Sequence, residues 1–268
     1  MKKSLVTLSR LALIVCMLNG IAFADFKEHY DLGQSYLLQY QYSGAITEFK
    51  SALRINYLDN SARIGLINSY ISRGVEYANK DKNYAKAADD FRSALFYLTY
   101  YPGQGAVQNS ASNIAQVQSN LDNCLAAIKF DTSAQNRYAT AKKLRAEGNF
   151  PAAAFEFIQS LGNRSLQKDS FEQVGDIMKI LGNDPKSAEY YKKAISVAPS
   201  DLDLRLAYAK ILDNMGASDD ALTQYSTVLS KTTADDKELL YTLERTFSKK
   251  LQDSPTNANL NANMGAIL

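Results

Sequence analysis

The sequence predicts an all-α protein, an α-solenoid of antiparallel helix-turn-helix repeats. Two observations lead to this prediction. A short pattern, small residue-x3-aromatic-x2-small residue, recurs along the chain of 268 residues. A second pattern of large and small residues precedes several copies, and a glycine often separates the two patterns. Because regular repeats of roughly 20 to 50 residues indicate stacked supersecondary units, each repeat is expected to contribute one helix pair to a continuous core.

The first 24 residues have the organisation of a secretory signal. Lys2, Lys3 and Arg10 form a basic region, an apolar stretch follows, and Ala22-Phe23-Ala24 is a small-x-small cleavage site. The apolar stretch is shorter than the roughly 20 residues that a spanning helix needs. We therefore expect cleavage after Ala24 and an exported protein of the periplasm or cell envelope. An uncleaved anchor and a lipoprotein at Cys16 are the alternatives, although Val15 is bulky for a lipobox.

The composition favours a folded, near-neutral protein. Hydrophobic residues make up 46% and charged residues 22%, which argues against disorder. Without the three basic residues of the first 24, the 30 basic residues become 27, against 28 acidic ones. A near-neutral chain has no electrostatic reason to bind nucleic acid or an anionic membrane. After cleavage only Cys124 remains, so no intramolecular disulfide can form, and we expect a core thiol.

Five copies of the small-aromatic-small pattern define the second helix of each repeat. They are Ala45-Phe49-Ala52, Ala87-Phe91-Ala94, Ala153-Phe157-Ser160, Ser187-Tyr191-Ala194 and Ala221-Tyr225-Val228. The last three copies follow one another at intervals of 34 residues. Small residues let two helices approach closely, and the aromatic ring fills the space between them. Glycines at 44, 148, 182 and 216 are expected at the turns between the two helices.

The copies and their breaks divide the chain into five predicted segments. After the signal at 1–24, residues 25–102 form an N-terminal pair of repeats, the second with an extended first helix. Residues 103–131 form one intervening helix of about 22 residues, because the apolar stripe from Val107 to Ile128 has no breaker. Residues 132–235 form three repeats. Residues 236–268 form an additional helix and an incomplete repeat, in which Met264, Ile267 and Leu268 lack their usual cover.

The intervening helix has a consequence for the whole array. In a helix-pair solenoid successive helices run in opposite directions, so each complete pair restores the direction of the chain. A single unpaired helix reverses the direction in which the following pairs begin. We therefore expect the array to divide near residue 131 into two segments with separate binding grooves.

The most regular unit, residues 168–201, resembles the tetratricopeptide repeat (TPR) family. Its matching residues are Phe171, Val174, Gly175, Met178, Gly182, Ser187, Tyr191, Ala194 and Pro199. Residues 26–59 match as well, with His29 in the usual Trp place. The resemblance covers most of the chain after residue 24. It implies a helical scaffold whose concave face binds a protein or peptide, with no small-molecule substrate.

The sequence offers no catalytic or metal-binding constellation. His29 is the single histidine, so a zinc site based on His or Cys lacks ligands, and we expect His29 to serve in packing. Gly103-Gln104-Gly105 has Gln108 where a dinucleotide fingerprint needs a third glycine. Acidic pairs such as Asp219-Asp220 fall near predicted helix starts, where they complement the helix dipole. We predict that the protein is not an enzyme, with no catalytic residue, metal or cofactor.

The candidate partner-binding residues follow one face of each first helix, which the resemblance places on the concave side. They are Tyr30, Gln34, Leu37, Ile64, Asn68, Ile71, Tyr138, Lys142, Asp176 and Lys210. The plainer interpretation is a solvated face, which suits the charged half of this stripe. The apolar residues of the first two repeats favour a partner site, because exposed apolar surface commonly marks one.

The predicted function is therefore a non-enzymatic scaffold that binds a protein or peptide in the bacterial cell envelope. The alternative is a structural or regulatory module of a larger envelope protein truncated at Leu268. The chaperone-binding subset of the TPR family uses Lys and Asn in its first units to bind a carboxylate. Tyr30 and Gln34 replace them here, so carboxylate binding of that kind is not predicted.

Overall fold

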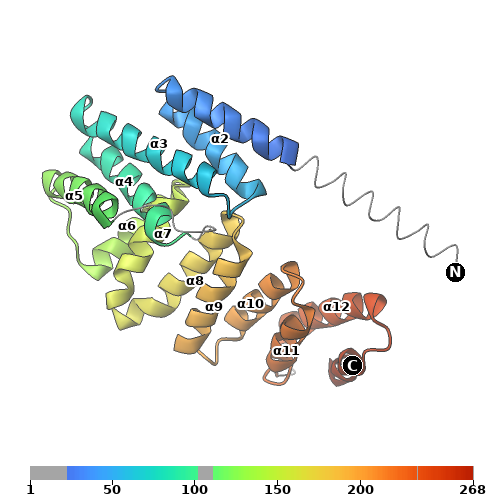
Figure 1. The fold of residues 1–268 in the computed structure, drawn as a ribbon. Coiled ribbons are helices and arrows are strands. Elements are labelled where there is room, and N and C mark those ends of the chain that lie inside the picture. The colour runs from blue at the N-terminus through green and yellow to red at the C-terminus, as the bar shows by residue number, and fades with distance from the viewer. Residues whose placement is uncertain (1–22, 102–110, 234, 268) are drawn as a thin grey trace, which may run out of the picture. The chain divides into compact units, whose positions relative to one another are not determined.

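The computed structural model describes residues 23–101, 111–233 and 235–267, and within these ranges the regular elements are all helices (Figure 1). The predicted all-α class is thereby confirmed. The chain divides into two compact units. Unit 1 comprises the chain up to Gly162 together with Ile180–Gly182, and unit 2 comprises Asn163–Lys179 and Asn183–Leu268. Each unit is described by itself.

Unit 1 consists of helices that pack on their neighbours in the sequence. A first helix covers residues 23–38. The others are α2 (Tyr42–Ile55), α3 (Asn60–Asn79), α4 (Tyr84–Thr99), α5 (Ala111–Ala127), α6 (Ala134–Ala146) and α7 (Phe150–Gln159). α2 packs on α3, α3 on α4 and α6 on α7. α3, at the place of the predicted extended first helix of the second repeat, has 20 residues.

Unit 2 continues the helix pairs. Its elements are α8 (Arg164–Ile180), α9 (Asp184–Val197), α10 (Leu202–Asn214), α11 (Ser218–Leu229), α12 (Lys237–Asp253) and α13 (Ala258–Ile267). The expectation that Met264 and Ile267 lack cover is wrong. α13 pairs with α12, Leu260 is buried, and Met264 and Ile267 pack against the core of α10, α11 and α12. Leu268 lies outside the described residues.

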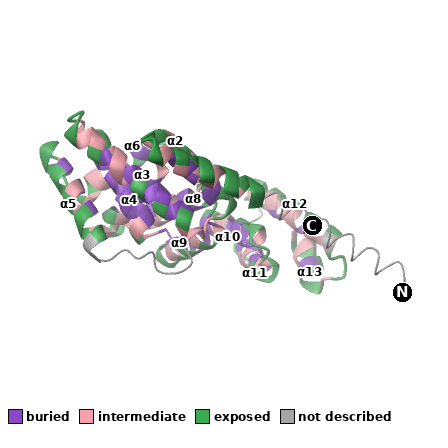
Figure 2. Cartoon of the chain, turned by 45° about the horizontal axis from the view of Figure 1, so that its top comes forward, coloured by how far each residue is buried: buried purple, intermediate pink, exposed green. Residues whose placement is uncertain are grey.

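The five small-aromatic-small copies form the seams between helices, as predicted. Every small residue and every aromatic residue of these copies is buried, and the least buried of them is Tyr191 at 5% exposed. Figure 2 shows the buried residues concentrated along α3 and α4, where these helices face their neighbours. The residues of the repeated pattern are therefore the ones that pack one helix against the next.

Turns between the helices of a pair use a left-handed backbone. Gly148, Gly182 and Gly216 have φ of 76°, 77° and 77°, a region that only glycine adopts without a steric cost. Gly44 was predicted at the corresponding turn of the first repeat, and this is wrong. Tyr40 holds that place with φ of 60°, whereas Gly44 lies inside α2 against the ring of Tyr36.

A second contact repeats across the seams and was not predicted. It joins a residue of the first helix to a residue of the second helix that lies 19 positions later in the sequence. This second residue immediately precedes the buried aromatic residue of the seam. The instances are His29 Nδ1 with Glu48 Oε2 at 2.7 Å, Arg137 Nη1 with Glu156 Oε2 at 2.9 Å, Arg205 Nη1 with Gln224 Oε1 at 3.2 Å, and the rings of Phe171 and Tyr190 at 6.3 Å. His29 thus contributes a cross-helix contact, and it remains half-exposed.

The intervening segment contains one helix, α5, within the described residues. It has 17 residues rather than about 22, and residues 102–110 lie outside the description. Cys124 is buried at 3% exposed, so the core thiol is confirmed, and burial raises its pKa. The predicted division of the array near residue 131 is wrong. Helix α4, before residue 131, packs on α7, after it, and both helices belong to unit 1.

Candidate binding groove

Two large hollows of unit 2 lie between α10 and α12. One has a volume of about 620 Å³ and the other about 650 Å³. Lys210 of α10 and Thr242 of α12 line both, so the two hollows are parts of one groove, which we call the α10–α12 groove. Both α10 and α12 are the first helices of their pairs, the position where the sequence placed the binding face.

One end of the α10–α12 groove is basic. Its cationic side chains are Lys210, Arg245, Lys249 and Lys250, against the single carboxylate of Asp213. Lys250 pairs with Asp213, and its Nζ lies 5.8 Å from the ring centroid of Tyr225. Within the described part of the chain, Lys210, Arg245 and Lys249 form no ion pair. Three cations are therefore available to a ligand at this end.

The other end is acidic. Asp203, Asp235, Asp236 and Glu238 line it, together with Lys210 and Lys237. Asp236 is the N-cap residue of α12, and its Oδ2 accepts hydrogen bonds from the N–H and hydroxyl of Thr233 at 3.2 and 3.0 Å. Carboxylates at the first turn of a helix are stabilised by its dipole. Asp203, Asp235 and Glu238 form no ion pair with another described residue.

The structure separates the two predicted site residues of unit 2. Lys210 is exposed and lies in the wall of the groove. Asp176 is half-buried and accepts a hydrogen bond from the hydroxyl of Tyr191, across the seam between α8 and α9. A role in packing therefore accounts for Asp176, and binding by Lys210 stays a prediction.

The predicted residues of the first repeat turn out to be partly structural. The ring of Tyr30 contacts that of Phe49 edge-on, with 6.0 Å between centroids, and stacks on Phe26 at 6.1 Å. Gln34 Nε2 donates to the Tyr30 hydroxyl at 3.1 Å. Leu37 is half-buried on the same helix. These contacts hold the side chains in place and leave them partly accessible.

The predicted residues of α3 are more accessible. Ile64 is 39% exposed and Asn68 is exposed, while Ile71, one turn further along, is half-buried. They follow one face at helical spacing, as the sequence predicted. Binding at this apolar face stays a prediction.

Tyr138 and Lys142 repeat the arrangement of the first unit. The ring of Tyr138 meets that of Phe157 edge-on at 5.5 Å, as Tyr30 meets Phe49. Lys142 is exposed, and its Nζ lies 5.9 Å from the Tyr138 ring centroid. The position that was predicted to face a partner therefore also supports the seam aromatic.

Sequence reasoning missed the α12 side of the groove. Tyr241, at 67% exposed, and the cations Arg245 and Lys249 were not among the predicted residues. The signal was present, because Arg245 and Lys249 are four residues apart and alternate with the buried Leu243 and Phe247. Because residues 236–268 were interpreted as an unfinished repeat, α12 could not be aligned with the first helices of the other repeats, and its groove-facing residues were not identified.

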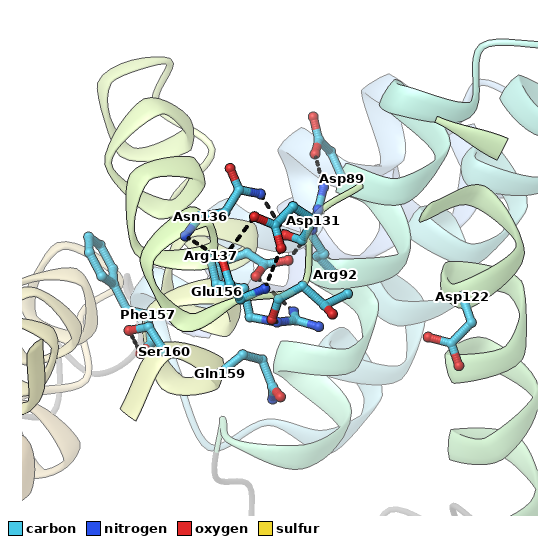
Figure 3. Close-up of polar contacts among 12 residues, drawn as sticks. Asp89, Arg92, Asp122, Asp131, Asn136, Arg137, Glu156, Phe157, Gln159 and Ser160 are labelled. Carbon is cyan, nitrogen blue, oxygen red and sulfur yellow. Dashed lines mark hydrogen bonds and ion pairs between the residues drawn. The ribbon is translucent and has the colours of Figure 1, made fainter. Parts of the chain in front are cut away.

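Unit 1 contains a buried charged cluster around Glu156 (Figure 3). Glu156 is fully buried and accepts from Arg92 Nε at 2.6 Å and from Arg137 Nη1 at 2.9 Å. Arg92 also donates to Asp89 at 2.8 Å, and its guanidinium lies 5.0 Å from the ring centroid of Phe130. Because both carboxylate oxygens of Glu156 are occupied and enclosed, this cluster joins α4, α6 and α7 and is not open to a ligand.

Metal and membrane features are assessed over the described residues: 23–101, 111–233 and 235–267. They contain no group of three or more His, Cys, Asp and Glu side chains that could hold a metal ion. Over the same ranges, no helix has both the length and the apolar character needed to cross a bilayer.

Neither a family model nor a curated protein matches the chain. Its helix pairs, its buried small-aromatic-small seams and its left-handed turns agree with the resemblance found in the sequence. The fold is TPR-like.

Solved structures similar to this TPR-like chain include several repeat proteins. YrrB, a TPR protein with an unusual peptide-binding site, is 14% identical, with 82% of this chain and 90% of that one covered and a TM-score of 0.39. PilF of Pseudomonas aeruginosa is 13% identical, with 90% and 97% covered and a TM-score of 0.36. A tetratricopeptide repeat protein of Parabacteroides merdae is 14% identical, with 91% and 99% covered and a TM-score of 0.33.

Proposed function

We propose that the protein is a non-enzymatic TPR-like scaffold that binds an extended segment of a partner protein in the α10–α12 groove. The observation that carries this proposal is a set of three cations, Lys210, Arg245 and Lys249, which form no ion pair with another described residue and surround a hollow of about 620 Å³. Cations without an intramolecular partner at the wall of a concave surface are suited to form charge-assisted hydrogen bonds with carboxylates of a ligand.

The shape and chemistry of the groove support a polypeptide rather than a small molecule. Both hollows are lined mainly by polar and charged side chains, whereas small-molecule sites are mostly apolar with a few polar groups. Tyr241 adds an exposed aromatic ring at the wall, and aromatic residues are enriched in the anchoring positions of protein interfaces.

A binding role is proposed in place of a catalytic one for a chemical reason. Among the described residues that line the groove there is neither histidine nor cysteine, so its ionisable groups are carboxylates, lysines, an arginine and tyrosines. Such a set forms ion pairs readily. It lacks the side chain that ordinarily exchanges protons near neutral pH.

The proposed location is the bacterial cell envelope. The support is the N-terminal sequence, with its basic start, its short apolar stretch and the small-x-small site ending at Ala24. N-terminal sequencing of the protein from fractionated cells tests this. Asp25 as first residue, in an extracytoplasmic fraction, is expected, and a mature protein that retains Met1 would contradict it.

The binding role is tested by photo-crosslinking in cells. A photoreactive residue in place of Tyr241, in the groove wall, should give a covalent adduct with a partner protein. The same residue in place of Lys192, an exposed position of α9 outside the groove lining, is the matched control. The adduct at position 241 should disappear when Arg245→Glu and Lys249→Glu are introduced. Equal adducts at both positions, or none at 241, would contradict the proposal.

A further inference from the structure

The two ends of the α10–α12 groove carry opposite charge. Four carboxylates gather where α12 begins, and four cations gather toward its other end. On α12 itself, Glu238 lies at the acidic end and Arg245 and Lys249 lie at the basic end. Lys210 and Lys237 also line the acidic end, where the four carboxylates outnumber them, and Asp213 is the one carboxylate among the four cations of the basic end. The excess charge therefore changes sign along one continuous hollow.

We infer that the α10–α12 groove selects a bipolar protein segment, one with a block of acidic residues and a block of basic residues. This inference rests on the proposed function and names the chemistry of the partner. The acidic block would lie against Lys210, Arg245 and Lys249, and the basic block against Asp203, Asp235 and Glu238. Like charges placed together cost free energy, so the segregated groove also rejects segments of a single sign.

The helix geometry sets the distance between the two blocks. Glu238 and Arg245 are seven residues apart and Glu238 and Lys249 eleven, which corresponds to roughly 10 to 17 Å at the α-helical rise. An extended peptide advances about 3.3 Å per residue. The centres of the acidic and basic blocks should therefore be separated by about three to five residues of the ligand.

A polyanion is a less suitable occupant. Nucleic acid would contact the cations of the basic end with its phosphates, but its continued backbone would then meet Asp203, Asp235 and Glu238. The acidic end therefore opposes a ligand that is negative throughout its length.

The inference is tested with synthetic peptides and fluorescence anisotropy on the full mature chain. The panel holds four labelled peptides of equal length: one with an acidic and a basic block, one with the same composition in alternating order, one all acidic and one all basic. We expect the block peptide to bind at least about tenfold more tightly than the alternating peptide at low salt. The difference should shrink as salt is added, because exposed charges are screened.

Charge reversal gives the sharper readout. Arg245→Glu with Lys249→Glu makes the basic end acidic, so the block peptide should lose its advantage and the all-basic peptide should become the preferred ligand. Lys192→Glu, an exposed change of the same sign in α9 outside the groove lining, should leave the order of the four peptides unchanged. Circular dichroism of each variant checks that it is folded.

The outcomes distinguish this inference from the proposed function. Equal binding of the block and alternating peptides, or tightest binding of the all-acidic peptide, would overturn the bipolar segment. If none of the peptides binds while position 241 still crosslinks a partner in cells, the inference fails and the binding role stands. If no peptide binds and position 241 gives no crosslink, both the inference and the proposed function are wrong.

Discussion

Gly65 of α3 lies directly against the ring of Phe49 of α2. A Cβ atom at Gly65 would be 2.4 Å from Cζ of that ring. Gly33, on the helix of residues 23–38, contacts the same ring, and a Cβ there would be 2.9 Å from Cδ1. One aromatic side chain thus occupies a space that two glycines keep open. Gly175 stands in the same relation to Tyr191, with a Cβ that would be 2.7 Å from Cδ2.

Gly65→Ala should destabilise the protein. In an exposed helix this change usually stabilises by about 0.5–1 kcal/mol, because alanine loses less conformational entropy. Here the added methyl group would overlap the buried Phe49 ring, and overpacking of a core costs roughly 1–3 kcal/mol. The free energy of unfolding in urea, for wild type and variant, gives the sign.

Gly265→Ala is the matched control. Gly265 lies within α13, is exposed, and has nothing within 4 Å of the position of a Cβ. This variant should be unchanged or slightly more stable. Loss of stability equal to that of Gly65→Ala would mean that the close contact with Phe49 does not determine the effect.

Tyr191→Ala should remove one of the seam aromatics and cost roughly 3–5 kcal/mol, as large-to-small core changes do. Tyr191→Phe keeps the ring and removes the hydroxyl that donates to Asp176, so it should cost about 1 kcal/mol. Tyr241→Ala, at an exposed position, should have little effect on stability. Chemical denaturation of the three variants measures this order, and a cost below about 0.5 kcal/mol for Tyr191→Ala would contradict it.

The helix pairs were predictable because the spacing that packs them is local. Ala45, Phe49 and Ala52 lie on one face of one helix, so their pattern is readable without knowing what covers it. The cross-seam contact of Arg137 with Glu156 was not predictable in the same way. It needs the register of two helices, which depends on turn length and on the left-handed residue at the turn.

The candidate site was predicted only in part. Lys210 was identified from its place on the first helix of a regular repeat. Arg245 and Lys249 were not, because the unit that contains α12 departs from the 34-residue spacing and its register could not be aligned. Tyr30 and Tyr138 were assigned to a partner surface, whereas each also packs edge-on against the buried aromatic of its own repeat.

Stability should depend on pH through Asp201, the N-cap residue of α10. Burial alone would raise the pKa of Asp201, but the N–H of Leu204 at 3.1 Å and the Lys168 ammonium at 3.1 Å outweigh it, so this pKa lies below its ordinary value. A lowered folded pKa contributes stability above the unfolded pKa of about 3.9, and this stability is lost as the pH falls through the folded pKa.

Asp201→Asn keeps an oxygen that can cap α10 and removes the charge. The wild type should exceed this variant in stability by up to about 1 kcal/mol at pH 6, as partly exposed ion pairs do. The difference should vanish as the pH approaches 2. Unfolding free energies at a series of pH values check this, and a difference that grows on acidification would contradict the assignment.

Glu156 is the residue on which the buried cluster of unit 1 depends. Its carboxylate is fully enclosed and accepts from both Arg92 and Arg137. Glu156→Ala would remove the carboxylate that Arg92 and Arg137 share, leaving Arg92 with Asp89 alone, and breaking a buried pair costs roughly 3–5 kcal/mol. Glu147→Ala, at an exposed position of the neighbouring turn, should change stability by less than about 0.5 kcal/mol.

Replacing the whole cluster should be far less damaging than breaking it. In a variant with Arg92→Met, Arg137→Met and Glu156→Leu, apolar side chains of similar volume fill the space. Asp89 loses its partner Arg92, but its side chain is 29% exposed and can be solvated. Such replacements are often neutral or stabilising by about 1–4 kcal/mol, because the cost of desolvating the ions disappears. Urea denaturation of the single and triple variants compares the two costs. A triple variant as unstable as Glu156→Ala would show that shape at this junction of α4, α6 and α7, and not charge pairing, determines stability.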